Sequence, residues 1–145
     1  MRGIPAVAVS LERGKGMDYA LAASFTRALI AHYQRWGFPP GVVVNVNVPA
    51  CAQSELKGVL FCGLSDFRWR NIWYRRTTPF GKRYYWSSVR RPLRPPTPGT
   101  DQWALNNKYI AVSFVPLTAP SATPYGLPRH FEDFRFGGLA PALVH

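Results

Sequence analysis

The acidic residues are the first place to look for hydrolytic chemistry, because paired carboxylates can hold a divalent metal ion or exchange a proton with a substrate. The chain contains 7 Asp and Glu residues, and only Glu132 and Asp133 are adjacent. These two lie in a proline-containing tail, where a solvated pair is expected in place of a metal site. His32 falls on the apolar side of a predicted helix, which is typical of a packed histidine. The residue types alone therefore indicate no complete catalytic set.

Two further motifs that often mark sites are weak in this chain. Gly14-Lys15-Gly16 lies between a predicted strand and a predicted helix, where an anion could bind, but it has neither the GxxxxGK[ST] nor the GxGxxG spacing. We expect it to be a flexible turn. Cys51 and Cys62 have no CxxC partner or nearby His, which argues against a zinc site and a disulfide scaffold and indicates buried thiols.

Positive charge and aromatic side chains are concentrated in one stretch. The chain has 18 Lys and Arg, with a net charge of +11, and residues 66–94 hold nine of these basic residues and one acid. Such a mixture can stack on bases and neutralise phosphates, so it could bind nucleic acid. Aromatic residues and Arg are also favoured at protein interfaces, and we favour a homo-oligomer interface. Its candidate residues are Trp69, Trp73, Tyr74, Tyr84, Tyr85 and Trp86.

The composition is that of one globular domain. The chain has 145 residues, and 47% of them are apolar. No apolar run approaches the roughly 20 residues of a membrane-spanning helix, and the first residues lack the pattern of a signal peptide. We therefore expect a cytoplasmic protein without a membrane partner.

The elements that must position any site begin with a strand, a helix and a second strand. Residues 4–11 are almost all apolar, which predicts a strand buried on both faces of a sheet. Asp18 can cap a helix that runs to about Trp36, with apolar residues, Trp36 among them, at three- and four-residue spacing. Residues 42–48 read VVVNVNV and predict the next strand. This order is a βαβ unit, so the predicted fold class is α/β.

The second half of the chain predicts a β-hairpin followed by a return to the sheet. A short strand is expected at residues 59–64. Residues 67–78 and 82–89 flank a Pro-Gly turn and predict the hairpin. A short helix near residues 102–107, capped by the preceding Thr or Asp, and a strand at residues 109–117 follow.

These elements divide the chain into four parts. We expect an α/β core at 1–65, the basic aromatic hairpin with a proline-rich connector at 66–98, a helix and strand returning to the core at 99–117, and an extended carboxyl-terminal arm at 118–145. Phe131, Phe134 and Phe136 in this arm are expected to contact another surface.

Five segments, in this order, resemble the carboxyl-terminal half of the survival protein SurE family. They are GIPAVAVSLE at 3–12, PPGVVVNVNVP at 39–49, KGV from Lys57, RRTTPFGKRYYW at 75–86 and GTDQWALNNKYIAVSFVPL at 99–117. The resemblance implies a partial Rossmann-like sheet with a protruding β-hairpin and an extended carboxyl-terminal arm. It also implies a nucleotidase, dependent on Mg²⁺ or Mn²⁺, that removes phosphate from nucleoside 5′- and 3′-monophosphates. The hairpin and arm would serve dimer or tetramer exchange.

The sequence departs from the family pattern at the metal ligands. In the family these are an Asp-Asp pair on an opening strand and a Ser and an Asn in an SGxNxG-like loop, all upstream of the GIPAVAVS segment. Neither motif occurs here, so no family ligand is carried over to a residue of this chain. We therefore expect the chain alone to bind no metal and to have no appreciable phosphatase activity. A gene fragment, a misassigned start codon and a split protein all remain open.

The resemblance leaves three candidates for substrate binding. Ser10 ends the first predicted strand, near the crevice where α/β sheets bind ligands, or it is only a strand-end hydroxyl. Thr100 and Asp101 could approach the same mouth, or Asp101 only caps a helix. The alternative to a nucleotidase is a non-catalytic module that oligomerises or binds nucleic acid through the hairpin.

Overall fold

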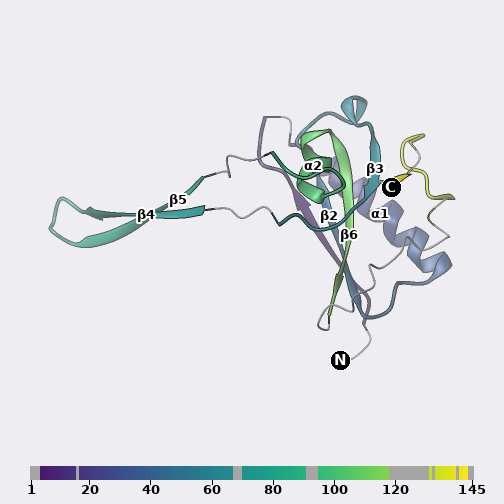
Figure 1. Ribbon diagram of the computed structural model, residues 1–145, viewed down its shortest axis with the longest axis horizontal. Coiled ribbons are helices and arrows are strands. Elements are labelled where there is room, and N and C mark those ends of the chain that lie inside the picture. Colours follow the sequence, from purple (N-terminus) through teal and green to yellow (C-terminus); the bar gives the residue numbers. More distant parts are fainter. Residues whose placement is uncertain are drawn as a thin grey trace. The chain divides into compact units, whose positions relative to one another are not determined.

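The computed structural model of the chain divides into two compact units, Met1–Ser65 with Thr97–His145 and Asp66–Pro96 (Figure 1). It describes residues 4–15, 17–66, 70–90, 95–117, 131, 133–139 and 141–143. Within these ranges, no helix combines the length and apolarity needed to cross a membrane.

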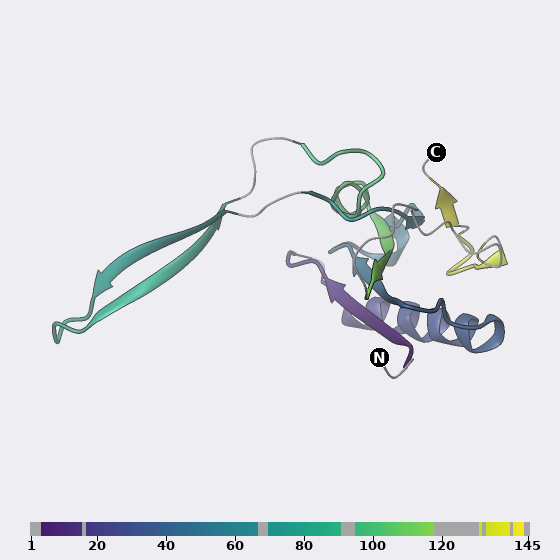
Figure 2. The same ribbon diagram turned by 60° about the horizontal axis from the view of Figure 1, so that its bottom comes forward.

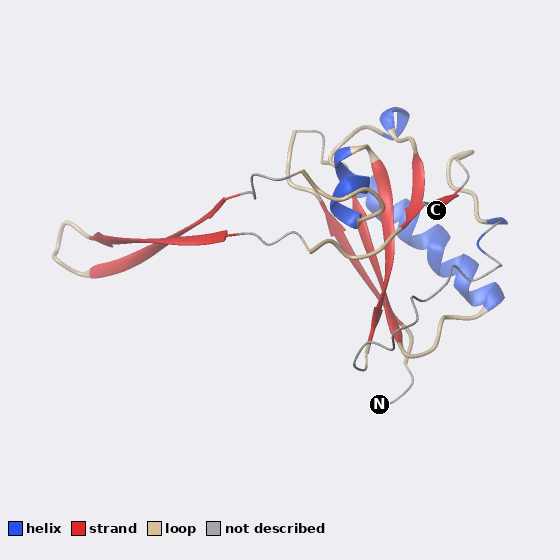
Figure 3. Cartoon of the chain, in the orientation of Figure 1, coloured by secondary structure: helices blue, strands red, loops and turns tan. Residues whose placement is uncertain are grey.

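The first unit is built on a five-stranded mixed sheet with the order β1-β2-β6-β3-β7. The strands are β1 (Ala6–Leu11), β2 (Val42–Val48), β3 (Gly58–Phe61), β6 (Tyr109–Pro116) and β7 (Pro141–Leu143). β1 is parallel to β2, β2 is antiparallel to β6, and β3 is parallel to both β6 and β7. The strands and helices together form a mixed α/β architecture, as the sequence predicts (Figure 3).

Helix α1 (Tyr19–Trp36) connects the two parallel strands β1 and β2. Asp18 caps it, because its Oδ1 accepts a hydrogen bond of 3.0 Å from the backbone N–H of Leu21. Gly37 ends it with a φ of 92°, in the left-handed region that favours glycine. The predicted βαβ unit and both ends of its helix are therefore confirmed.

The main core lies between α1 and one face of the sheet. Leu21, Phe25, Leu29 and Tyr33 pack there with alternate valines of β2. The sequence also assigned Trp36 to this stripe, but its side chain is 50% exposed, because the helix ends there and the core stripe ends at Tyr33. A smaller cluster of Leu60, Ala104 and Ala111 involves β3, β6 and the short helix α2 (Asp101–Asn106).

Strand β1 is less buried than its composition predicts. Its residues are exposed or half-buried, and Val9 is 39% exposed. Among the described residues β1 pairs with β2 alone, so it forms an edge of the sheet (Figure 2). The prediction of a strand buried on both faces is therefore wrong for this structure.

The described residues beyond 130 join the core. Phe131, Phe134 and Phe136 are 0%, 3% and 9% exposed and belong to the main cluster, while β7 extends the sheet beside β3. Burial of the three phenyl rings in this cluster removes apolar surface from water, which stabilises the folded chain. This differs from the extended arm expected at residues 118–145; residues 118–130, 132, 140, 144 and 145 lie outside the described part.

The second unit is an antiparallel ribbon of β4 (Arg70–Thr77) and β5 (Arg83–Arg90). Its turn is closed by a hydrogen bond of 2.9 Å from the Gly81 N–H to the Thr78 carbonyl, and Gly81 has a φ of 76°. A residue with a side chain would be strained at that φ. The predicted hairpin is confirmed over β4 and β5 with its Pro-Gly turn, while residues 67–69 of its predicted first strand lie outside the described residues.

The remaining regular element is a short 3-10 turn, η1 (Gln53–Glu55), between β2 and β3. Nearby, Glu55 accepts a hydrogen bond from the Lys108 ammonium, and this lowers the pKa of the Glu55 carboxyl. The pair lies on the surface, so it contributes little to folding.

Candidate functional site

Asp101, at the start of α2, joins three parts of the first unit through its carboxylate. Oδ1 accepts hydrogen bonds of 2.8 Å from the backbone N–H groups of Ser65 and Gln102. Oδ2 accepts a longer bond of 3.5 Å from the side-chain amide of Asn47, on β2. The carboxylate therefore fixes the loop after β3 and the Asn47 side chain relative to α2.

Ser10 lies directly beside Asn47 in the sheet. The two residues are partners in the parallel register of β1 and β2, and partners in a sheet project to the same face. Both stand near the carboxyl ends of their strands, where open α/β sheets commonly bind ligands. Ser10, Asn47 and Asp101 thus form one polar site, which is the candidate functional site of this chain.

Thr100 is close in sequence to this polar site, but its hydroxyl is engaged elsewhere. Its Oγ1 donates a hydrogen bond of 2.6 Å to the Thr97 carbonyl. Thr100 is the N-cap residue of α2, yet its side chain makes no cap hydrogen bond. Of the two expected capping residues, Asp101 is the one whose side chain accepts from a backbone N–H in the first turn, that of Gln102. Asn47 therefore links Ser10, its register partner, with Asp101, whereas the Thr100 hydroxyl is bonded to Thr97 outside this site.

A second polar contact lies on the same sheet face. Cys62 Sγ is 3.6 Å from Ser113 Oγ, and Ser113 is the register partner of Asn45 on β2. Burial raises the pKa of the Cys62 thiol to about 11, so very little thiolate forms at neutral pH. Cys51 is buried, Cys62 is half-buried, and both are free thiols. The half-burial of Cys62 is a small departure from the buried pair that the sequence indicates.

The donor set does not fit a divalent metal ion. In the described ranges no three His, Cys, Asp or Glu side chains come together in a way that could hold one. The Asp101 carboxylate already accepts three protein hydrogen bonds. His32 packs among aromatic rings, with its centroid 4.7 Å from that of Phe131, as expected for a core histidine.

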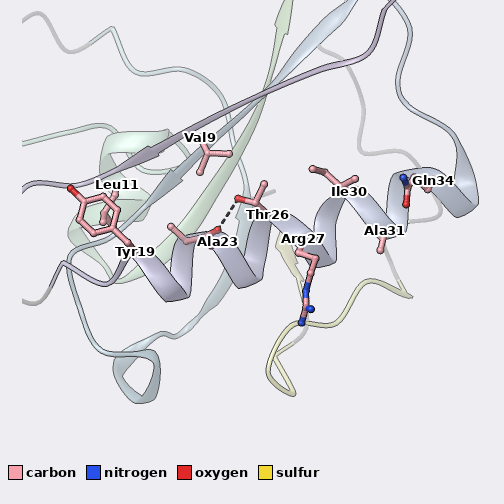
Figure 4. Close-up of a pocket in the computed structure, with 10 residues that line it drawn as sticks. Val9, Leu11, Tyr19, Ala23, Thr26, Arg27, Ile30, Ala31 and Gln34 are labelled. Carbon is pink, nitrogen blue, oxygen red and sulfur yellow. Dashed lines mark hydrogen bonds between the residues drawn. The ribbon is translucent and has the colours of Figure 1, made fainter.

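A large apolar groove lies on the other face of the sheet from the polar site. Its volume is about 660 Å³, and it runs between β1 and α1 (Figure 4). Figure 4 shows Val9 and Leu11 above the helix and Thr26 and Ile30 facing them from below. Its lining contains a single charged side chain, Arg27, so its chemistry suits an apolar protein surface better than a phosphate ester.

The hairpin carries aromatic and basic side chains on both of its faces. Tyr74 pairs with Trp86 on one face, and Arg75 pairs with Tyr85 on the other. Trp73, Tyr85 and Trp86 are 63%, 65% and 64% exposed, and Tyr74 and Tyr84 are also exposed. Trp69, the sixth predicted interface residue, lies outside the described residues.

Asn47 and the Ser65 N–H complete the polar site, and neither is among the residues predicted from the sequence. The alternation in VVVNVNV places Asn45 and Asn47 on one face, opposite the buried valines, and this was a readable signal. The Ser65 contact has no such signal, because it depends on how the loop after β3 meets α2.

Comparison with known proteins gives consistent matches. The family model "Survival protein SurE" matches residues 1–71. The 5'-nucleotidase SurE 1 of Thermus thermophilus is 39% identical over 116 residues, which cover 79% of this chain and 45% of that protein. The 5'-nucleotidase SurE of Heliobacterium modesticaldum is 32% identical over 139 residues, covering 96% of this chain and 50% of that protein.

A solved structure has the same fold. The crystal structure of the SurE protein from Aquifex aeolicus matches with a TM-score of 0.64 and 24% identity, over 82% of this chain and 48% of that one. The chain therefore spans about half the length of the relatives that it matches.

Proposed function

Because this chain belongs to the survival protein SurE family, we propose that it forms the carboxyl-terminal half of a nucleotidase that hydrolyses nucleoside monophosphates. The observation that carries the proposal is the match, over most of the chain, to relatives that are 5'-nucleotidases. Its proposed setting is the cytoplasm, as the sequence analysis expects.

In this proposal the polar site holds the substrate. The Ser10 hydroxyl is exposed and can donate a hydrogen bond to a phosphate oxygen or a ribose hydroxyl. Asp101 acts as a positioning residue, since its Oδ2 accepts from the Asn47 amide and thereby orients it. Thr100 is the weaker candidate because its hydroxyl donates to Thr97.

In this proposal the residues that bind the metal ion lie outside this chain. The family implies Mg²⁺ or Mn²⁺, and the described donor set does not fit either ion. The match covers about half of each relative, so the proposal assigns the metal ligands to the remaining half. We therefore expect the 145-residue chain alone to have no appreciable phosphatase activity.

The test is a phosphate-release assay on 5′- and 3′-nucleoside monophosphates with Mg²⁺ or Mn²⁺. The chain is assayed alone and together with the part of the Thermus thermophilus relative outside the match. We expect phosphate release from the combination only. Ser10→Ala should lower kcat/KM of the combination by about tenfold, since one hydrogen bond to a charged group is lost. Ser24→Ala, on α1, is the matched control. Full activity of the chain alone would contradict the proposal.

A second proposed role is assembly of identical chains through the hairpin. It is supported by the exposed rings of Trp73, Tyr74, Tyr84, Tyr85 and Trp86, which are typical of interfaces. Trp73→Ala and Tyr85→Ala should then lower the oligomer mass in light scattering. If the two variants leave the oligomer mass unchanged and the chain binds RNA with an affinity that falls steeply from the lower to the higher of two salt concentrations, the hairpin is a nucleic-acid-binding module.

A further inference from the structure

Figure 1 shows β4 and β5 as one twisted two-stranded ribbon, and their register assigns each side chain to one of its two faces. Tyr74 pairs with Trp86, and Arg76 pairs with Tyr84, so these four side chains project to the same face. All four are exposed, and the Trp86 ring is 64% exposed. These residues define the Trp86 face of the ribbon.

The three rings of the Trp86 face are spaced for separate bases. Tyr84 and Trp86 are two residues apart on β5, which places their Cβ atoms about 6.8 Å apart. Tyr74 lies opposite Trp86, with about 5 Å between the Cβ atoms. Bases in a duplex are stacked at intervals of about 3.4 Å and cover each other's faces. Each ring can therefore stack on one base of an extended single strand, whereas the bases inside a duplex offer no free face.

Positive charge accompanies these rings, and the ribbon holds no acid to neutralise it. Residues 70–90 contain six Lys and Arg residues and no Asp or Glu. Arg76 lies opposite Tyr84, and Arg70, an even number of residues before it on β4, projects to the same face. The whole chain has a net charge of +11, so a second copy is a poor electrostatic match for this face. A polyanion with unpaired bases matches both the charge and the rings.

We propose that the Trp86 face binds single-stranded nucleic acid, with one base stacked on each of its three rings and the phosphates beside Arg70 and Arg76. An anionic lipid surface would match the charge, but it offers the rings no planar partner. The opposite face carries Trp73 and Tyr85 and stays available for the assembly of identical chains. The inference rests on the residues of the ribbon itself and is independent of the nucleotidase activity.

Binding is measured on the full chain by fluorescence anisotropy, without divalent metal. The labelled probes are an oligoadenylate RNA of about ten nucleotides, the DNA of the same sequence, and the duplex of the RNA with its complement. Both single strands should bind, because bases and phosphates are common to them. Log affinity falls by about 0.7 per neutralised phosphate of a single strand, so contacts from Arg70 and Arg76 predict a fall of about sevenfold between about 50 and 200 mM salt.

Two tryptophans of nearly equal exposure provide a matched pair of variants. Trp86 is 64% exposed, and Trp73, on the opposite face, is 63% exposed. Trp86→Ala should weaken binding of both single strands by about thirtyfold, because the stacking of one base is lost. It should leave any binding of the duplex unchanged, since that binding depends on charge alone. Trp73→Ala should change the single-strand affinity by less than about twofold.

Two conservative changes separate stacking and charge from folding of the ribbon. Trp86→Phe keeps an aromatic ring and should restore most of the affinity that Trp86→Ala loses. Arg76→Gln should make the slope of log affinity against log salt shallower by about 0.7, because one phosphate contact is lost.

Photochemical cross-linking locates the strand on the unaltered chain. A single-stranded RNA that contains 5-bromouracil is irradiated in the complex, and mass spectrometry of the digested protein identifies the modified residues. We expect cross-links to Tyr74, Tyr84 or Trp86.

Four outcomes would overturn the inference. They are no binding of either single strand, equal effects of Trp86→Ala and Trp73→Ala, cross-links confined to residues outside the Trp86 face, and binding of anionic lipid vesicles in preference to single strands. The last result would identify a lipid surface as the partner. Single-strand binding by a chain whose combination with the rest of the Thermus thermophilus relative releases no phosphate would refute the nucleotidase proposal and leave this inference standing.

Discussion

Replacing Phe131 by Ala tests whether the carboxyl-terminal segment is part of the core. Its ring is fully buried, with ring centroids 4.6 Å from Phe61, 4.7 Å from His32 and 5.1 Å from Tyr33. Truncating a buried Phe to Ala costs about 4 kcal/mol of unfolding free energy, through lost transfer energy and the cavity left behind. At about 3 °C per kcal/mol for a chain of this size, the melting temperature should fall by roughly 12 °C.

The assay is urea and thermal unfolding of the full chain, followed by circular dichroism and by light scattering at the same protein concentration. Phe80→Ala is the matched control, because the Phe80 ring is 96% exposed in the hairpin turn, and it should leave the midpoint almost unchanged. If Phe131→Ala left the unfolding midpoint unchanged and lowered the oligomer mass, the core packing described here would be refuted. The sequence-based expectation of a ring that meets another surface would then be correct.

Three further measurements address the sheet face, the thiol and the helix cap. Asp101→Ala should lower the unfolding free energy by about 2 kcal/mol because its hydrogen bonds to Ser65 and Asn47 are lost. Asp101→Asn should lower it by less than about 1 kcal/mol because one oxygen acceptor remains. The midpoints of urea unfolding measure both effects. Burial raises the pKa of Cys62 from 9.0 to about 11, so its contribution to stability is complete below pH 9.0 and is lost as pH rises towards 11. Cys62→Ala should flatten that part of the pH profile, and a wild-type profile already flat there would count against the burial of the thiol. Asp18→Ala removes the cap of α1 and should cost about 1 kcal/mol in thermal unfolding, an effect that Asp18→Ser should largely restore.

Local signals in the sequence predicted the βαβ unit and the hairpin well. Residues 42–48 alternate in the pattern of a strand with one buried face, and the structure places β2 there. Asp18 and Gly37 mark the helix ends by chemistry that acts within one turn. Such signals need no knowledge of the rest of the fold.

Long-range packing could not be predicted in the same way. Phe131 joins the core through contacts with residues about a hundred positions away in the chain, and no local pattern distinguishes this from an interface ring. Trp36 continues the apolar spacing of α1, but the core ends one turn earlier. The sequence predicted only part of the polar site, namely Ser10 and Asp101. The Asn47 amide that links them could not be predicted, because its contact with Asp101 depends on how β2 and α2 pack together.

The backbone pairing around Gly63 has a practical consequence for the insertion of residues 66–96. The Gly63 N–H donates to the Gly99 carbonyl at 3.1 Å, the Asp101 N–H donates to the Gly63 carbonyl at 2.9 Å, and Gly63 bridges Thr100. The segments that lead into and out of the ribbon are thus hydrogen-bonded to each other. A short Gly-Ser linker between Ser65 and Thr97 should close the gap, and the excised ribbon becomes an exchangeable module whose length and chemistry can vary while the sheet stays intact.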